Sequence, residues 1–299
     1  MADSEYWYLS PWQDRRCIVA MNTSLTLLGT AGGPTPQGHR HAPANVVVVN
    51  GSAYVFDCGN GVADQLVRAG IPFSALRAVF VTHNHSDHNA DLGNLLLLGW
   101  SGITRPVEVY GPAPIASPMK YFFEMQRYDI DIRVRDEGRR PLDELVDVTE
   151  IDSAGVVYRD ENVTVTSTLV VHPPVEPAFG YRIDSADRSI VFSGDTRPCD
   201  SLVELARGAD VLVHEALYEP ALGGLLSRHN GSRIREHLLA SHTHAHEAGD
   251  VARRAGVQTL VLNHLVPCDG TVDDETWRSE AARNFDGDIV VAHDLMQLS

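Results

Sequence analysis

The most restrictive feature of the sequence is a run of polar side chains, His83-Asn84-His85-Ser86-Asp87-His88. The residues directly before it, Leu76 to Thr82, have the length and composition of a buried strand, so the run is predicted to lie on a loop at a strand end. Three imidazoles and a carboxylate this close together offer little packing and compete for the same hydrogen-bond partners. The run therefore predicts a metal site.

The donor types indicate which metal such a site prefers. Neutral imidazoles with a carboxylate suit zinc, with Mn²⁺ and Fe²⁺ as alternatives, whereas calcium and magnesium sites are richer in oxygen ligands. Two metals need more ligands than one short loop provides. Three later segments place a suitable side chain where a predicted strand ends, namely His172, Asp195 and His264.

The rest of the chain alternates short apolar segments with helical patterns. Asn50-Gly51 between two apolar segments predicts a β-hairpin, and the spacing of apolar residues after Gly61 predicts a helix up to Gly70. The second half repeats this organisation, with predicted strands at Val163 to Val171, Gly180 to Asp184, Ser189 to Ser193, Ala209 to His214 and Thr259 to Leu262, and a helix at Ala245 to Ala255. Two similar halves predict an α/β fold, an αββα sandwich of two mixed β-sheets flanked by helices. We expect residues 1–22 to be an N-terminal extension and residues 23–299 to form a single domain.

Composition limits the partners and the compartment. The formal charge is −16, from 40 acidic and 24 basic residues, and such a field repels phosphate backbones unless a basic patch overrides it. Since no such patch is visible, we expect no nucleic-acid partner. The apolar runs are far shorter than the roughly 20 residues that cross a bilayer, and the first residues lack a secretory signal pattern. The four cysteines form no CxxC pair. The sequence therefore predicts a soluble, cytoplasmic protein without a membrane contact.

The sequence resembles the metallo-β-lactamase superfamily, and within it the branch that contains ribonuclease Z and the arylsulfatase-like zinc enzymes. The segments that carry the resemblance follow one another in the expected order: Leu28-Gly29-Thr30, Phe56-Asp57-Cys58-Gly59, Thr82-His83-Asn84-His85-Ser86-Asp87-His88, Phe192-Ser193-Gly194-Asp195-Thr196, Val213-His214-Glu215-Ala216, His242-Thr243-His244-Ala245 and Leu262-Asn263-His264. The HxHxDH element is highly specific, and the last two segments are moderately so.

The resemblance implies a role for each matching residue. One metal would be held by His83, His85 and His172, the second by Asp87, His88 and His264, and Asp195 would bridge the two. A hydroxide between the metals would be the nucleophile, oriented by Asp87. Glu215 and His242 would form a pair that passes a proton to the leaving group. The alternative for Glu215 is that it only orients a ligand histidine.

The sequence is less informative about the substrate. The interval from His172 to Asp195 spans 23 residues, too short for the protruding arm with which bacterial ribonuclease Z enzymes grip transfer RNA. Together with the acidic charge, this favours a dinuclear hydrolase of a small-molecule ester: an arylsulfatase-like sulfate ester, a phosphodiester or a lactone. The alternatives are a ribonuclease Z-like phosphodiesterase acting on RNA and a catalytically idle metal-binding protein.

Several aromatic residues and histidines remain open. An apolar stripe within residues 100–134 predicts either a lid or pocket wall, or else plain core or the contact of a homodimer; it consists of Met119, Phe122, Phe123, Met125 and Tyr128. Phe179 and Tyr181 line the pocket or only pack in a strand. His39 and His41 lie in a loop that family members bring near the metals, but solvated loop histidines are common and we favour that interpretation. No role is assigned to His229, His237, His244, His246 and His293.

Overall fold

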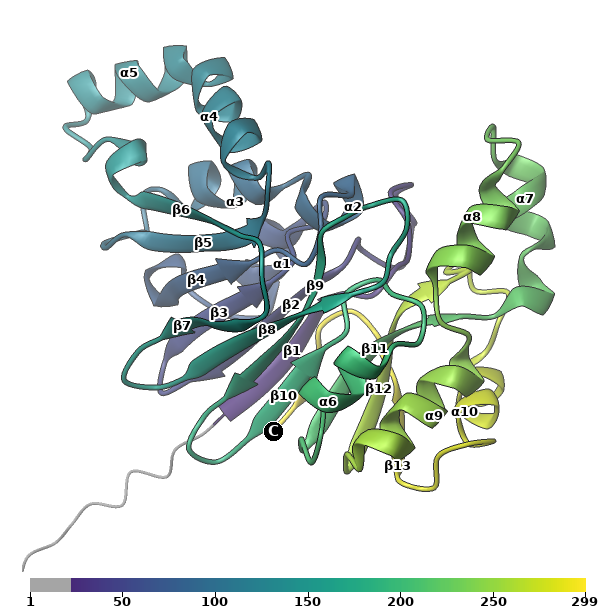
Figure 1. Cartoon of the computed structure of the whole chain (residues 1–299). Coiled ribbons are helices and arrows are strands. Elements are labelled where there is room, and N and C mark those ends of the chain that lie inside the picture. The colour runs from purple at the N-terminus through teal and green to yellow at the C-terminus, as the bar shows by residue number, and fades with distance from the viewer. Residues whose placement is uncertain (1–22) are drawn as a thin grey trace, which may run out of the picture.

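Two mixed seven-stranded β-sheets lie face to face in the computed structural model of the chain, which describes residues 23–299 (Figure 1). The strand order is β14-β1-β2-β3-β4-β5-β6 in the first sheet and β13-β12-β11-β10-β9-β8-β7 in the second. Each half of the chain thus builds one sheet, and only β14 returns to the other. The predicted extension, residues 1–22, lies outside the described residues.

The strands of the first sheet are β1 (Thr23–Gly29), β2 (Ala44–Val49), β3 (Ser52–Phe56), β4 (Leu76–Phe80), β5 (Val107–Pro112), β6 (Val146–Ile151) and β14 (Met296–Leu298). The strands of the second are β7 (Gly155–Arg159), β8 (Thr164–Val170), β9 (Ala178–Asp184), β10 (Ser189–Phe192), β11 (Val211–Leu217), β12 (Thr259–Val266) and β13 (Asp288–Val291). Both sheets combine antiparallel hairpins with parallel neighbours, so β3, β4 and β5 run parallel, as do β10, β11 and β12. In each parallel set the carboxyl ends of the strands meet at one edge of the sheet.

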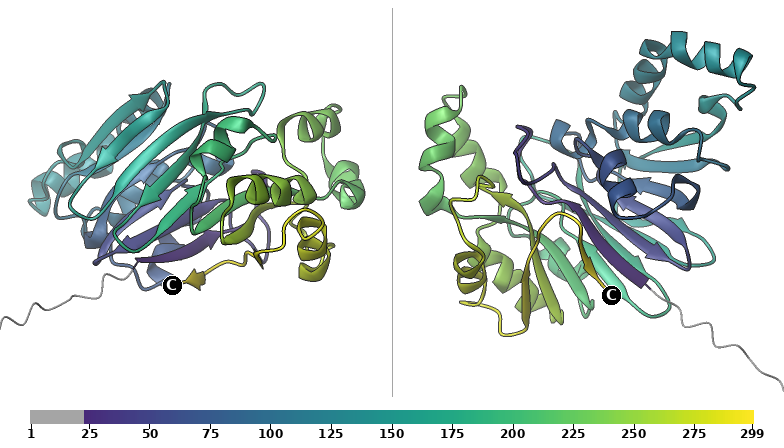
Figure 2. Two further views of the ribbon diagram at one scale, coloured as in Figure 1. Left: turned by 60° about the horizontal axis from the view of Figure 1, so that its bottom comes forward. Right: turned by 180° about the vertical axis from the view of Figure 1, so that it is seen from behind.

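Helices cover the outer faces of both sheets, as two further views show (Figure 2). The α-helices are α1 (Val62–Arg68), α2 (Ser86–Asn89), α3 (Leu92–Gly99), α4 (Ala116–Met125), α5 (Arg127–Asp136), α6 (Asp200–Leu205), α7 (Gly223–Arg228), α8 (Ile234–Ser241), α9 (Ala245–Ala255) and α10 (Asp274–Ala281). Three 3₁₀ turns span Phe73–Ala75, Leu142–Glu144 and Glu219–Ala221. The pairs α4–α5 and α7–α8 project from the body at the upper left and upper right of Figure 1.

Side-chain alternation along the strands explains why the sheets pair. Val46 on β2 faces the helices, and its neighbour Val47 faces the other sheet; Val79 and Phe80 on β4 divide in the same way. Because successive residues of a strand point to opposite faces, strands that are apolar at every position need cover on both sides. The predicted αββα sandwich is therefore confirmed. That residues 23–299 form one domain stays a prediction, which the shared apolar layer between the sheets supports.

The predicted local elements are found with small shifts at their ends. Asn50 and Gly51 both have positive φ, as the turn of a two-residue hairpin requires. The helix predicted over residues 245–255 has those limits in the structure. None of the helices in residues 23–299 is long and apolar enough to cross a membrane.

The aromatic residues left open by the sequence have mainly packing roles. Met119 and Phe123 belong to the core beneath α4, whereas Met125 and Tyr128 are 69% and 82% exposed. Phe179 and Tyr181 are fully buried in the layer between the sheets. The stripe is thus partly core, and a homodimer contact through its exposed part stays a prediction.

A carboxylate near one edge ties the two sheets together. Asp160, in the turn between β7 and β8, accepts hydrogen bonds from the Tyr54 hydroxyl on β3 at 2.6 Å and from the Tyr158 hydroxyl at 2.8 Å. The backbone N–H groups of Asn162 and Val163 donate to its other oxygen. Burial alone would raise the pKa of Asp160, but these donors stabilise the ionised form and hold the pKa below its ordinary value.

We expect Asp160→Ala to lower the free energy of unfolding by about 1–3 kcal/mol at pH 7, because buried hydroxyls lose their acceptor. Since the folded-state pKa is depressed, this contribution is fully present above the unfolded pKa of about 3.9, declines below it and is lost as the pH falls through the folded-state pKa. Urea denaturation at pH 7 and pH 3 measures both effects. Asp152→Ala, at an exposed loop position that makes none of these contacts, is the control. An equal loss at both pH values would contradict the assigned role.

Candidate metal centre

Strand ends deliver the predicted ligands to one place. His83 follows β4, His172 follows β8 and Asp195 follows β10, so side chains separated by more than 100 residues converge at one edge of the sandwich. Each is almost completely buried. The apolar strands account for this, because they end in the core and the polar residues that follow them closely remain inside.

His264 reaches the site by a different route from the one expected. It does not follow the strand but lies within β12, where the pairing with β11 shifts between Glu215 and Ala216 and leaves His264 as an extra residue. Its φ is +42°, a conformation that L residues rarely adopt. This β-bulge turns the imidazole out of the ladder toward the carboxylates.

One group of ligand atoms is built from His83, His85, His172 and Asp195. Nδ1 of His85 lies 3.1 Å from Nε2 of His83 and 3.1 Å from Nε2 of His172. Oδ2 of Asp195 lies 3.8 Å from Nε2 of His83 and 4.0 Å from that of His172. Three nitrogens and one oxygen therefore surround a common point, the donor set that a zinc-type ion takes.

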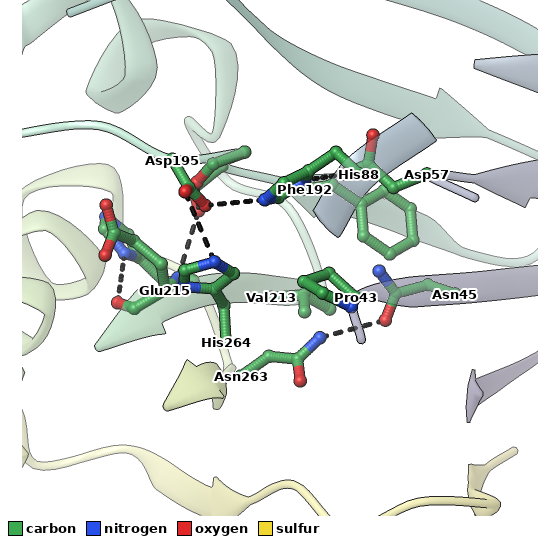
Figure 3. A pocket seen from close by; sticks show the side chains of 13 residues that line it. Pro43, Asn45, Asp57, His88, Phe192, Asp195, Val213, Glu215, Asn263 and His264 are labelled. Atoms are coloured by element: carbon green, nitrogen blue, oxygen red, sulfur yellow. Dashed lines mark hydrogen bonds and ion pairs between the residues drawn. The ribbon is translucent and has the colours of Figure 1, made fainter. Parts of the chain in front are cut away.

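The second group contains Asp87, His88, Asp195 and His264. Nε2 of His264 lies 3.2 Å from Asp195 Oδ2, and Nε2 of His88 lies 3.3 Å from Asp195 Oδ1 (Figure 3). Nε2 of His264 also lies 3.4 Å from Asp87 Oδ2. Asp195 belongs to both groups, as expected of a bridging carboxylate. Gly33, in the loop between β1 and β2, donates its backbone N–H to Asp87 at 3.1 Å, so this loop contacts the site through its backbone.

Unpaired polar atoms indicate that the cluster is built to bind cations. Nε2 of His88 and Oδ1 of Asp195 are buried, and although they lie 3.3 Å apart, neither makes a hydrogen bond with acceptable geometry within residues 23–299. Such atoms are costly unless something else satisfies them. Burial lowers the pKa of His172 to about 4, so its imidazole is neutral and able to coordinate. Burial would raise the pKa of Asp87, but the neighbouring His88 and His264 outweigh it and lower it to about 2. The donor set thus suits a pair of divalent metal ions.

Two supporting contacts were not anticipated. Asp57, at the end of β3, accepts from Thr82 N at 2.8 Å and lies 2.8 Å from Nδ1 of His88, which orients that ring. The backbone oxygen of Ser241 accepts from Nδ1 of His172 at 3.0 Å. Asp57 lies in one of the segments that match the family, so its role as a partner of His88 could have been predicted. The contact of the Ser241 backbone oxygen with His172 leaves no signal in the sequence.

Glu215 and His242 form a buried pair beside the ligands. Nδ1 of His242 lies 2.8 Å from Oε2 of Glu215, whose other oxygen accepts from Thr196 N at 2.7 Å. Burial would lower the pKa of His242, but the carboxylate outweighs it and raises the pKa to about 9. Burial in turn raises the pKa of Glu215. The predicted pairing of these two side chains is present.

The remaining histidines divide into two kinds. Nδ1 of His41 forms a hydrogen bond with Oδ2 of Asp294 at 2.8 Å. Neither His41 nor His39 belongs to a group of potential ligands in the described part of the chain. His237, to which no role was assigned, lies close to the cluster on α8: its ring centroid is 6.0 Å from that of His172. The sequence offered no sign of this proximity, since His237 matches no motif.

With this geometry established, comparisons with known proteins identify the family. The family model described as "Beta-lactamase superfamily domain" matches residues 52–265. A protein named Ribonuclease Z from Mycobacterium bovis is 36% identical over 275 residues, which cover 91% of this chain and 96% of that protein. The chain belongs to the metallo-β-lactamase superfamily. It is a metal-dependent hydrolase, and its relatives place it with ribonuclease Z.

Solved structures share the fold at lower identity. The short form of human tRNase Z aligns with a TM-score of 0.68 and 22% identity, covering 92% of this chain and 98% of that one. The metallo-β-lactamase fold protein YhfI from Bacillus subtilis aligns with a TM-score of 0.69 and 22% identity, with the same coverage. These likenesses support the fold assignment.

The comparisons overturn two predictions. The main prediction, an arylsulfatase-like hydrolase of a small-molecule ester, is wrong, because the relatives at 34–36% identity are named Ribonuclease Z. The expectation of no nucleic-acid partner is wrong for the same reason. Both rested on the net charge and on the short interval after His172. The interval forms β9 and β10, so the arm is absent. The absence of one RNA-binding arm does not exclude RNA as a substrate, and the net charge of the whole chain does not describe the electrostatic potential at a buried metal site.

Asp195→Ala is expected to reduce the metal content of the purified protein to about one ion or fewer, because the shared carboxylate has no substitute nearby. Elemental analysis of protein purified without chelators measures this. Asp286→Ala, at an exposed position outside the ligand groups, is the matched control and retains the wild-type content. Full loading of the Asp195 variant would contradict the bridging assignment.

Proposed function

We propose that this protein is a ribonuclease Z-type phosphodiesterase that cleaves RNA, with transfer RNA as the substrate class. The observation that carries the proposal is the 36% identity to Ribonuclease Z across 91% of the chain. The complete group of potential ligands and the Glu215–His242 pair support it, because a metal-binding protein without catalytic activity does not need a buried proton donor. The fold shared with human tRNase Z is consistent with it.

The metal ligands belong to the same proposal. His83, His85 and His172 hold one ion, and Asp87, His88 and His264 hold the second, with Asp195 shared. Zinc is the proposed metal, since imidazole nitrogen and carboxylate oxygen are its usual donors, and Mn²⁺ and Fe²⁺ remain alternatives. When bound, such ions lower the pKa of water and offset negative charge on the phosphate.

The protein's own side chains position the reactants. Asp87, held by Gly33 N–H, orients the attacking water with its carboxylate. Glu215 accepts from Nδ1 of His242, so the other ring nitrogen is free to donate a proton to the departing oxygen. His242 lies beside both ligand groups, with its ring centroid 5.1 Å from that of His172 and 5.8 Å from that of His264. Asp87, Glu215 and His242 are therefore the proposed catalytic residues.

A cytoplasmic location completes the proposal. Its support is the RNA substrate together with the state of Cys58, Cys199 and Cys268, which are all free thiols in the described part of the chain. Free cysteines are usual in a reducing compartment.

The proposal predicts that the protein with two zinc ions cleaves a transfer RNA extended by a single-stranded 3′ tail, and cleaves the unextended molecule far more slowly. A flexible tail reaches a buried site more readily than a folded duplex. Gel analysis of end-labelled RNA measures this, with Asp195→Ala as the inactive control. Hydrolysis of nitrophenyl sulfate or a lactone without RNA cleavage would contradict the proposal.

His242→Ala should slow RNA cleavage about 10²–10⁴-fold, the usual contribution of a general acid. Hydrolysis of bis-nitrophenyl phosphate should fall much less, because nitrophenolate leaves without a proton. Steady-state kinetics on both substrates, at wild-type metal content, measures the difference. The matched control is His246→Ala, a half-buried histidine on α9. Equal losses on both substrates would remove the proton-donor role.

A further inference from the structure

Helix α8 is attached directly to the metal centre. Its last residue, Ser241, accepts from Nδ1 of the ligand His172 through its backbone oxygen at 3.0 Å, and its hydroxyl donates to the backbone oxygen of Pro173. The next residue is His242, whose ring is held by Glu215. The C-terminal turn of α8 therefore has a fixed position relative to the ligands, although α7 and α8 project from the body (Figure 1).

His237 lies one helical turn before Ser241 and faces the same side. Its ring centroid is 6.1 Å from that of His85, 6.0 Å from that of His172 and 5.9 Å from that of His242, with interplanar angles of 75°, 70° and 89°. The ring is thus equally close to two proposed ligands of one metal and to the proposed proton donor. It belongs to none of the groups of potential ligands found in residues 23–299.

The polar atoms of His237 are largely unused. Nδ1 lies 3.5 Å from the Ser241 hydroxyl, at the limit of a hydrogen bond, and Nε2 has no hydrogen bond to any residue of the described chain. The side chain is half-buried, so part of it is accessible to solvent. A histidine that served only as packing on α8 would point to the apolar cluster of Leu222, Leu238 and Val266 instead.

We propose that His237 forms a binding subsite for the nucleotide on the leaving-group side of the scissile phosphate, to which Nε2 donates a hydrogen bond. This inference rests on the proposed function. His242 marks the side from which the leaving oxygen departs, and His237, which is less buried than His242, lies next to it. A ribose or phosphate oxygen of the departing nucleotide is the acceptor that matches an imidazole N–H there. In this way α8 contributes to binding RNA in a protein without the arm between His172 and Asp195.

The test compares three variants of the two-metal protein, His237→Ala, His237→Phe and His237→Gln. The phenylalanine retains the bulk and loses the donor, whereas the glutamine retains a donor. We expect kcat/KM for the tailed transfer RNA to fall about 10- to 100-fold in the first two, as for a lost hydrogen bond to a charged group, and to recover in part with glutamine. Hydrolysis of bis-nitrophenyl phosphate, which carries no nucleotide, should stay within about threefold.

Metal content and the control His246→Phe accompany each measurement. Wild-type RNA cleavage by His237→Phe would overturn the subsite while leaving the proposed function intact. Equal losses on both substrates, or a loss of metal, would also overturn it, because His237 would then support the ligands rather than the substrate. A wild-type protein that does not cleave RNA would overturn the proposed function and the subsite together.

Discussion

The site depends on one buried carboxylate. Asp195 is 2% exposed and lies within 4.0 Å of four imidazoles, and one of its oxygens has no hydrogen-bond partner in residues 23–299. An ionised carboxylate in such a position is costly unless positive charge compensates for it. A pair of cations would supply that charge, so the burial of this carboxylate at the strand ends favours a metal site. The surrounding contacts keep the imidazoles in place for this purpose.

The architecture explains how side chains from distant parts of the chain meet at one site. Each sheet contains a parallel set whose strands end at the same edge, and ligands from both halves of the chain meet there. The bulge at His264 and the Asp57–His88 contact adjust individual rings. Helix α8 joins this arrangement through Ser241, so a projecting element is linked directly to His172, a proposed metal ligand.

The net charge and the short interval after His172 led to a wrong prediction of the substrate. A formal charge of −16 describes the whole surface, but the potential near two bound cations is dominated by those ions. The absence of an arm removes one way of holding RNA and does not exclude others, as the position of His237 beside His242 illustrates. Relatives that share a third of the sequence carried more information about the substrate than net charge did.

The sequence by itself determined the layered fold and the identity of the candidate ligands. Strands that are apolar at every position must be covered on both faces. Polar residues that follow such a strand closely are buried at its end. Both features are local and can be read from residues 76–88. Only the tertiary structure decided that His264 occupies a bulge, that a backbone carbonyl of Ser241 orients His172, and that His237 approaches the site. These depend on register between strands and on the direction of a helix, which are set by contacts between residues far apart in the chain and leave no pattern in the sequence.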